Sequence, residues 1–189
     1  MFSGFQPTVQ LAHLWLNDFL KPGATAVDAT VGNGHDTLFL ARIVGANGRV
    51  YGFEIQEKAL HNTLELLKTE GFADIVKLFQ TGHENIAHHI QNEVDVIIFN
   101  LGYLPGGDHS IVTRPETTMK AVTEGLALLK KGGAMCLVVY TGHPGGEEEQ
   151  LQLEGFLGQL DKKKFCVTKL SFLNRDCAPY IIMIEKSIA

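Results

Sequence analysis

Three carboxylates surround a glycine-rich turn near the start of the chain. Asp28 ends a short apolar run, Asp36 follows Gly32 and Gly34, and Glu54 lies further on. Glycines let the backbone approach a ligand without a Cβ in the way. Three carboxylates would repel a pyrophosphate, but they suit a ligand with an ammonium, a sulfonium and a ribose diol. The turn therefore predicts a binding site for S-adenosylmethionine.

Two other nucleotide sites do not fit this turn. A dinucleotide site needs a third small residue where Thr37 stands, because a glycine there lets the helix pack on the strand. The Gly-Lys-Ser/Thr ending of a phosphate-cradling loop is also absent from the sequence.

A second signal for the cofactor comes 20 residues after Gly34, where Glu54 ends an expected strand. In nucleotide-binding α/β domains this position reaches the ribose hydroxyls. A carboxylate accepts both hydrogen bonds of a diol, so we expect Glu54 to bind the ribose and Gln56 to lie along the adenine. The alternative for Glu54 is a solvated strand end.

Alternating strands and helices must position these residues. We expect helices at residues 7–20, 36–44, 57–69 and 116–130 and another that begins at Glu147, with strands at 24–29, 49–54, 75–79, 94–99, 134–140, 165–173 and 180–185. The short connection between the last two strands requires them to be antiparallel. The order predicts an α/β fold with helices on both faces of a seven-stranded, mostly parallel sheet that ends in an antiparallel C-terminal strand pair. This order resembles the Rossmann-like architecture of class I methyltransferases.

The apolar strand at 94–99 delivers Asn100-Leu101-Gly102-Tyr103 beside the first strand. This tetrapeptide occupies the place of the Asn-Pro-Pro-Tyr motif of amino-group methylases. That likeness implies that the Asn100 side-chain carbonyl and the next backbone carbonyl accept hydrogen bonds from the target nitrogen. Leu101 and Gly102 replace both prolines, so a planar exocyclic amine is not assured as the target. The alternative for Asn100 is a loop-capping residue.

Three motifs together, at residues 28–37, 100–108 and 142–146, narrow the resemblance. They make the whole chain resemble the YtqB-like family of class I S-adenosylmethionine-dependent methyltransferases, long labelled rRNA methylases. The resemblance implies methylation of the amine of 5-aminomethyl-2-thiouridine at the tRNA wobble position, with the tRNA anticodon region as partner. The alternatives are an rRNA methyltransferase, a small-molecule amine methyltransferase and a non-enzymatic S-adenosylmethionine binder.

The motifs and the resemblance together nominate the site residues. Those expected to bind the cofactor are Asp28, Gly32, Asn33, Gly34, Asp36, Thr37, Glu54, Gln56, His83, Glu84, Asn100, Leu101 and Gly102. An aliphatic ammonium must lose a proton before it can attack a methyl group, and the candidate catalytic residues are Asn100, Tyr103, Asp108, His109 and His143. The candidates for binding the substrate are Tyr103, Arg114, Tyr140 and His143. His109 and His143 could equally structure their loops, and Arg114 could bond loop carbonyls instead of a phosphate.

Composition limits the remaining possibilities. The chain has 189 residues and a net charge of -5, which argues against tight non-specific nucleic-acid binding. No apolar run is long enough to span a membrane, and the N-terminal residues do not have the pattern of a signal peptide. The three cysteines have no CxxC spacing, which is typical of reduced, mostly buried thiols in a cytoplasmic protein. His83 and His88 lie five apart rather than four, so we expect no metal.

We expect a single domain over 1–189 whose N-terminal segment, 1–22, packs on the sheet edge or covers the crevice. The sequence is compatible with a homodimer.

Overall fold

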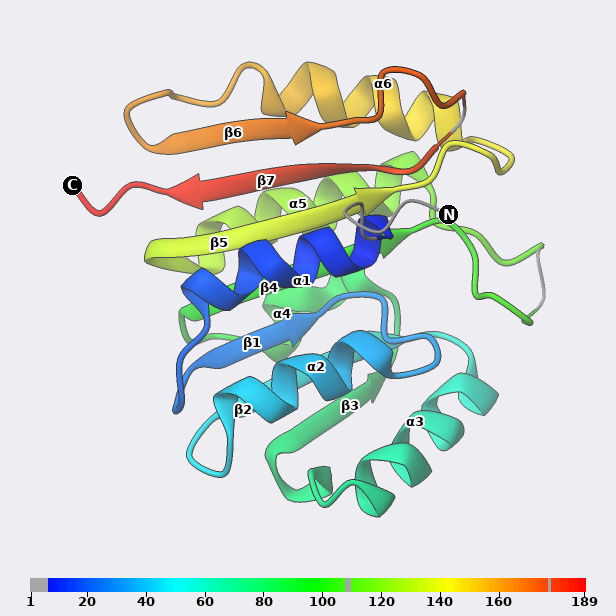
Figure 1. Ribbon diagram of the computed structural model, residues 1–189, viewed down its shortest axis with the longest axis vertical. Helices are drawn as coiled ribbons and strands as arrows, with labels where there is room; N and C mark the ends of the chain where they lie inside the picture. Colours follow the sequence, from blue (N-terminus) through cyan, green and yellow to red (C-terminus); the bar gives the residue numbers. More distant parts are fainter. Residues whose placement is uncertain (1–6, 108–109, 177) are drawn as a thin grey trace.

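The computed structural model describes residues 7–107, 110–176 and 178–189. In these parts the strands form one seven-stranded sheet in the order β3-β2-β1-β4-β5-β7-β6 (Figure 1). The strands are β1 Thr25–Asp28, β2 Arg49–Glu54, β3 Val76–Gln80, β4 Val94–Leu101, β5 Leu129–Val139, β6 Phe165–Leu170 and β7 Tyr180–Lys186. The helices are α1 Thr8–Phe19, α2 His35–Val44, α3 Glu57–Thr69, α4 Ile86–His89, α5 Pro115–Leu128 and α6 Gly146–Leu157, with 3-10 turns at Ala73–Ile75 and His83–Asn85.

The predicted fold class is confirmed. Strands β1 to β5 are parallel, and β7 runs antiparallel between β5 and β6. The bounds of β2 and α3 agree with the prediction residue for residue. Strong local patterns explain this agreement, because both segments begin and end at clear changes from apolar periodicity to turn residues.

The boundary between α5 and β5 was predicted wrongly. The helix ends at Leu128, and β5 begins at Leu129 instead of Ala134. Leu129 pairs with Val94, after which the register shifts. Lys130, the last residue of the expected helix, donates from Nζ to Asp95 Oδ2 at 2.7 Å. Residues 131–133, which fall between the expected helix and the expected strand, therefore belong to the irregular start of a strand that pairs with β4.

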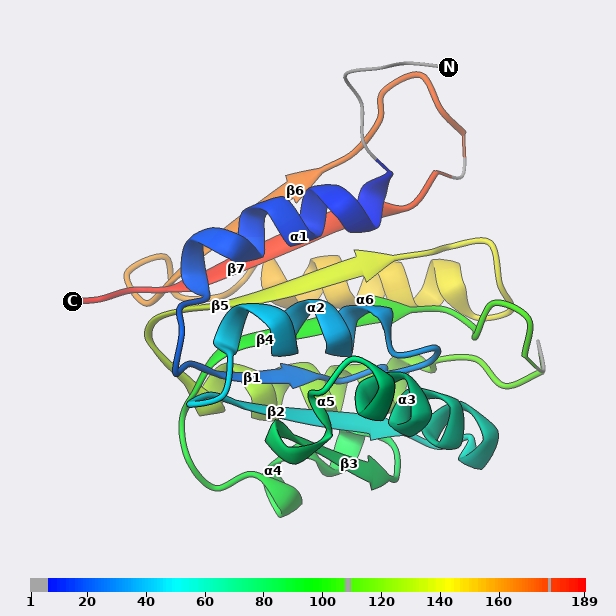
Figure 2. The ribbon, with the colours of Figure 1, turned by 60° about the horizontal axis from the view of Figure 1, so that its bottom comes forward.

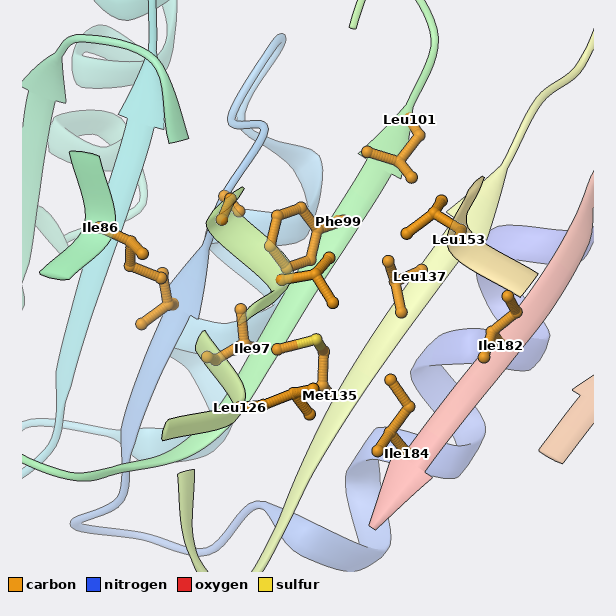
Figure 3. Packing of buried hydrophobic residues seen from close by; sticks show 14 of the residues in the cluster. Ile86, Ile97, Phe99, Leu101, Leu126, Met135, Leu137, Leu153, Ile182 and Ile184 are labelled. Atoms are coloured by element: carbon orange, nitrogen blue, oxygen red, sulfur yellow. The ribbon is translucent and has the colours of Figure 1, made fainter. Parts of the chain in front are cut away.

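Strand β4 is longer than predicted, because it runs to Leu101 and includes Asn100. Side chains alternate between the faces of a strand. Ile97, Phe99 and Leu101 pack with Met135 and other apolar residues on one face of the sheet (Figure 3). Asn100 consequently lies on the opposite face, which carries α1 and α2.

Two apolar layers hold the sheet between its helices. Figure 1 shows α1 and α2 in front of the sheet and α5 and α6 behind it. Residues of α1 and α2 share the front layer with β1, β4 and β5, and residues of α4, α5 and α6 share the rear layer. Helix α1 packs on β5, β4 and β7 (Figure 2), so it lies on the sheet face and not at the sheet edge.

No helix within the described residues is long and apolar enough to cross a membrane. Cys136 is buried as expected, but Cys166 is exposed on β6, and Cys177 lies outside the described residues.

Candidate functional site

A cavity of about 770 Å³ opens where β1, β2 and β4 end, which is the ligand position of open α/β sheets. Its lining includes thirteen of the predicted site residues: Gly32, Asn33, Asp36, Glu54, Gln56, His83, Glu84, Asn100, Leu101, Gly102, Tyr103, Arg114 and Tyr140. Four predicted residues do not line the cavity: Asp28, Gly34, Thr37 and His143. The candidates Asp108 and His109 lie outside the described residues.

Glu54 connects the end of β2 to the glycine turn. Its Oε2 accepts the backbone N–H of Gly32 at 2.9 Å, and its Oε1 accepts the backbone N–H of Gln56 at 2.9 Å. A carboxylate has about four acceptor positions. Both oxygens therefore keep acceptor capacity toward the cavity, which is what a ribose diol requires.

Asp28 and Thr37 form a buried brace beneath the turn instead of contacting a ligand. Asp28 Oδ2 accepts a hydrogen bond from Thr37 Oγ1 at 2.6 Å, and its Oδ1 accepts from Thr30 N at 3.1 Å. Both side chains are fully buried. Burial, together with the nearby charge of Asp36, raises the pKa of Asp28 to about 7. The sequence indicated correctly that Asp28 belongs to this turn, but not that it points away from the cavity.

Gly34 allows the glycine turn to pack closely against helix α3. Its φ of +79° is left-handed, and a Cβ would lie 2.7 Å from the side chain of Thr63. Thr63 in turn donates from Oγ1 to the carbonyl of Gly32 at 3.0 Å. The close approach therefore joins the turn to α3, whereas we expected it to admit the cofactor.

His83 provides an acceptor at the end of the cavity beside β3. Its Nδ1 lies 3.3 Å from the carbonyl oxygen of Ala29, so Nδ1 carries the proton and donates it. Burial lowers the pKa of His83, which favours the neutral ring. Nε2 has no hydrogen-bond partner among the described residues. Beside the apolar walls from Phe53 and Ile55, this end of the cavity suits a heteroaromatic base with a donor group.

Asn100 is held at both its backbone and its side chain. Its backbone N–H donates to Thr30 Oγ1 at 2.7 Å, and its Nδ2 donates to Asp36 Oδ2. Asn100 Oδ1 is buried and has no partner within the described parts of the chain. The amide therefore presents an oxygen acceptor at the cavity wall. The role of Thr30 was not predicted, although its place between Asp28 and Gly32 was a signal that could have indicated it.

The loop after β4 folds back on itself beside the cavity. Tyr103 forms an isolated bridge with Val112, and Thr113 N donates to Gly102 O at 2.8 Å. The carbonyl of Leu101 accepts from Tyr140 N at 3.2 Å, so part of its acceptor capacity is used within the protein. Tyr103 and Tyr140 are 44% and 37% exposed, which leaves both rings accessible from the cavity mouth.

His143 and Glu149 lie behind this loop. His143 is buried, with Nε2 3.7 Å from Glu149 Oε2. Glu149 accepts hydrogen bonds from Thr118 at 2.5 Å and Thr113 at 2.9 Å, and burial raises its pKa. The sequence predicts His143 as a crevice residue and gives no signal for its pairing with Glu149. Instead the pair anchors the loop base to α5 and α6.

In the part of the chain that the structure describes, the site thus combines the Glu54 carboxylate, the unpartnered Nε2 of His83 and the unpartnered Oδ1 of Asn100 around one cavity, which Asp36 and Glu84 also line. Within the described residues no group of three or more His, Cys, Asp or Glu side chains could hold a metal ion. The chemistry that fits is the binding of a nucleoside cofactor beside a hydrogen-bond acceptor for a second ligand.

Known proteins share this fold and much of the sequence. A family model described as "Putative rRNA methylase" matches residues 50–186. A chloroplastic tRNA (mnm(5)s(2)U34)-methyltransferase of Arabidopsis thaliana is 37% identical over 193 residues, covering 97% of this chain and 70% of the relative. The crystal structure of a "putative rRNA-methylase" from Clostridium thermocellum has a TM-score of 0.94 at 45% identity, covering 96% of this chain and 98% of that one. A "putative methyltransferase" from Streptococcus mutans in complex with SAH has a TM-score of 0.87 at 35% identity, covering 96% and 99%.

Proposed function

This chain belongs to the family described as "Putative rRNA methylase" and is an S-adenosylmethionine-dependent methyltransferase, and from that premise we propose that it methylates the amine of 5-aminomethyl-2-thiouridine at the wobble position of tRNA. The name of the Arabidopsis relative supports tRNA over rRNA as the substrate. The anticodon region is accordingly the proposed partner.

The observation that carries the proposal is the free acceptor of Asn100. Oδ1 is buried at the cavity wall without a partner among the described residues, and an unsatisfied buried acceptor is costly. An amine N–H would satisfy it. A hydrogen bond there would also aim the nitrogen lone pair, and alignment of the reacting groups supplies much of the catalysis of a displacement.

S-adenosylmethionine supplies a methyl group made electrophilic by its sulfonium. The chain's residues hold it and exclude water: Glu54 would bind the ribose hydroxyls, and His83 with Glu84 and Gln56 would surround the adenine. The carboxylates in the cavity lining also favour a cationic ligand over an anionic one.

The substrate ammonium must become an amine before it can attack. Tyr103 lines the cavity, and we propose that it contacts the amine or stacks on the base. Asp108 and His109 remain predictions for accepting the proton. His143 is not retained as a candidate because it is buried beside Glu149. Arg114, which is exposed and lines the cavity, is proposed to contact a phosphate.

The test is transfer of radiolabel from S-adenosylmethionine to two tRNA pools, one bearing the unmethylated 5-aminomethyl group and one lacking it. We expect label only in the first pool, and nucleoside analysis should find it in 5-methylaminomethyl-2-thiouridine. Equal labelling of both pools would contradict the proposal, as would label found only on ribosomal RNA or only on a small amine.

A further inference from the structure

A hydrogen-bonded chain connects helix α1 to Asn100. His13 Nε2 lies 2.6 Å from Asp36 Oδ1, and Asp36 Oδ2 accepts from Asn100 Nδ2. An ionised carboxylate can only accept, so Nε2 carries the proton of the imidazole. Three residues that lie far apart in sequence thus form one line from the surface to the cavity.

Asp36 decides which end of the Asn100 amide faces the cavity. With the amide reversed, its oxygen would oppose a carboxylate oxygen. The carboxylate therefore selects the orientation that places Nδ2 inside and leaves Oδ1 as the acceptor for a ligand. Both carboxylate oxygens of Asp36 are engaged by these two partners.

His13 in turn holds Asp36. The side chain of Asp36 is 8% exposed and that of His13 is 21% exposed, so the pair is shielded from water. The imidazole stacks on Phe39 with ring centroids 3.8 Å apart and an interplanar angle of 2°, which fixes its plane. Ala12 and Leu16, on the same helix, are fully buried against the sheet. The sheet thus anchors the helix that carries His13.

We propose that His13 is a positioning residue for methyl transfer, acting through Asp36 on the orientation of Asn100. The role of Asn100 in binding the amine rests on the proposed function above. Helix α1 thereby becomes part of the site, although its own cavity contact is made one turn earlier, by Val9.

The test compares His13→Leu, His13→Gln and Asn17→Leu. Leucine keeps apolar contact with Phe39 but cannot donate. Glutamine places an amide N–H near the position of Nε2. Asn17 is exposed one turn further along the same face of α1, and it controls for a change in the helix surface.

We expect His13→Leu to lower kcat on aminomethyl tRNA by about 10- to 100-fold, since misplacement of a reacting group costs up to roughly that much. The KM for S-adenosylmethionine should not change. His13→Gln should recover most of the lost kcat, and Asn17→Leu should match the unmodified protein. An unchanged kcat in His13→Leu, or an equal loss in His13→Gln, would overturn the proposal.

A measurement without substrate separates this proposal from the proposed function. The side-chain amide signals of Asn100 in a ¹H–¹⁵N spectrum can be identified by their loss in Asn100→Ser. They should move in His13→Leu and stay in place in Asn17→Leu. If the unmodified protein methylates neither tRNA pool, the proposed substrate is wrong, while the spectra still decide whether His13 orients Asn100. Amide signals that stay in place in His13→Leu would refute that role.

Discussion

Gly32 donates its backbone N–H to the carboxylate of Glu54 across 2.9 Å, so the residue that ends β2 also holds the glycine turn that follows β1. The same carboxylate lines the cavity. Glu54 therefore connects the shape of the turn to the binding of the ligand.

Replacement of Glu54 should weaken cofactor binding. Glu54→Ala removes the charged acceptor and should reduce the affinity for S-adenosylhomocysteine by about 1.5–3 kcal/mol per lost hydrogen bond to the ligand. Calorimetry measures this loss. Glu57→Gln is the matched control, because this substitution removes the same negative charge from a nearby side chain that is exposed. An affinity that survives Glu54→Ala would remove this residue from the ribose site.

Asn100→Ala should separate positioning from cofactor binding. If Oδ1 orients the amine, kcat and kcat/KM fall together, by about 100-fold. The affinity for S-adenosylhomocysteine, measured by calorimetry on the same variant, should be retained. A higher KM for S-adenosylmethionine with unchanged kcat would instead make Asn100 a cofactor ligand.

Asp28 should make the stability of the cofactor-free protein depend on pH. Its pKa is raised by burial from 3.8 to about 7, so the folded state binds a proton more tightly than the unfolded state. The resulting stabilisation is complete below pH 3.8 and is lost as the pH rises through about 7. Asp28→Asn cannot titrate. The melting temperature of the unmodified protein should therefore fall, relative to that of Asp28→Asn, as the pH rises from about 5 to about 8. Thermal unfolding of both proteins is measured at steps of about one pH unit. A constant or opposite difference would contradict the assignment.

Gly34→Ala should destabilise the protein more than Gly145→Ala. Both glycines are left-handed helix N-caps, with φ of +79° and +83°, and alanine at either position costs about 1–2 kcal/mol of backbone strain. A Cβ at position 145 would have nothing within 4 Å, whereas one at 34 would meet the Thr63 side chain at 2.7 Å. Chemical denaturation gives the two free energies of unfolding. Equal losses would show that Thr63 moves aside without cost.

The amino-acid sequence by itself determined the order of the elements and the place of the cofactor site. Alternation of apolar strands with amphipathic helices is a local property, and β2 and α3 followed it to the residue. The glycine turn and Glu54 were also recognisable, because turn residues and strand ends occur at characteristic spacings. Parallel strands then bring their carboxyl ends to one edge of the sheet, which placed Glu54 and Asn100 at the same cavity.

Only the tertiary structure decided where individual side chains point. Asp28 turned inward to Thr37 and His143 packed against Glu149, although local spacing placed Asp28 and His143 beside the ligand. Leu129 joined a strand because Val94 offered it a partner, which no helical periodicity reveals. His13 reached Asp36 because α1 crosses the sheet face, a contact between residues 23 positions apart. Such contacts depend on how helices cross the sheet and on strand register. Neither can be predicted from a local sequence pattern.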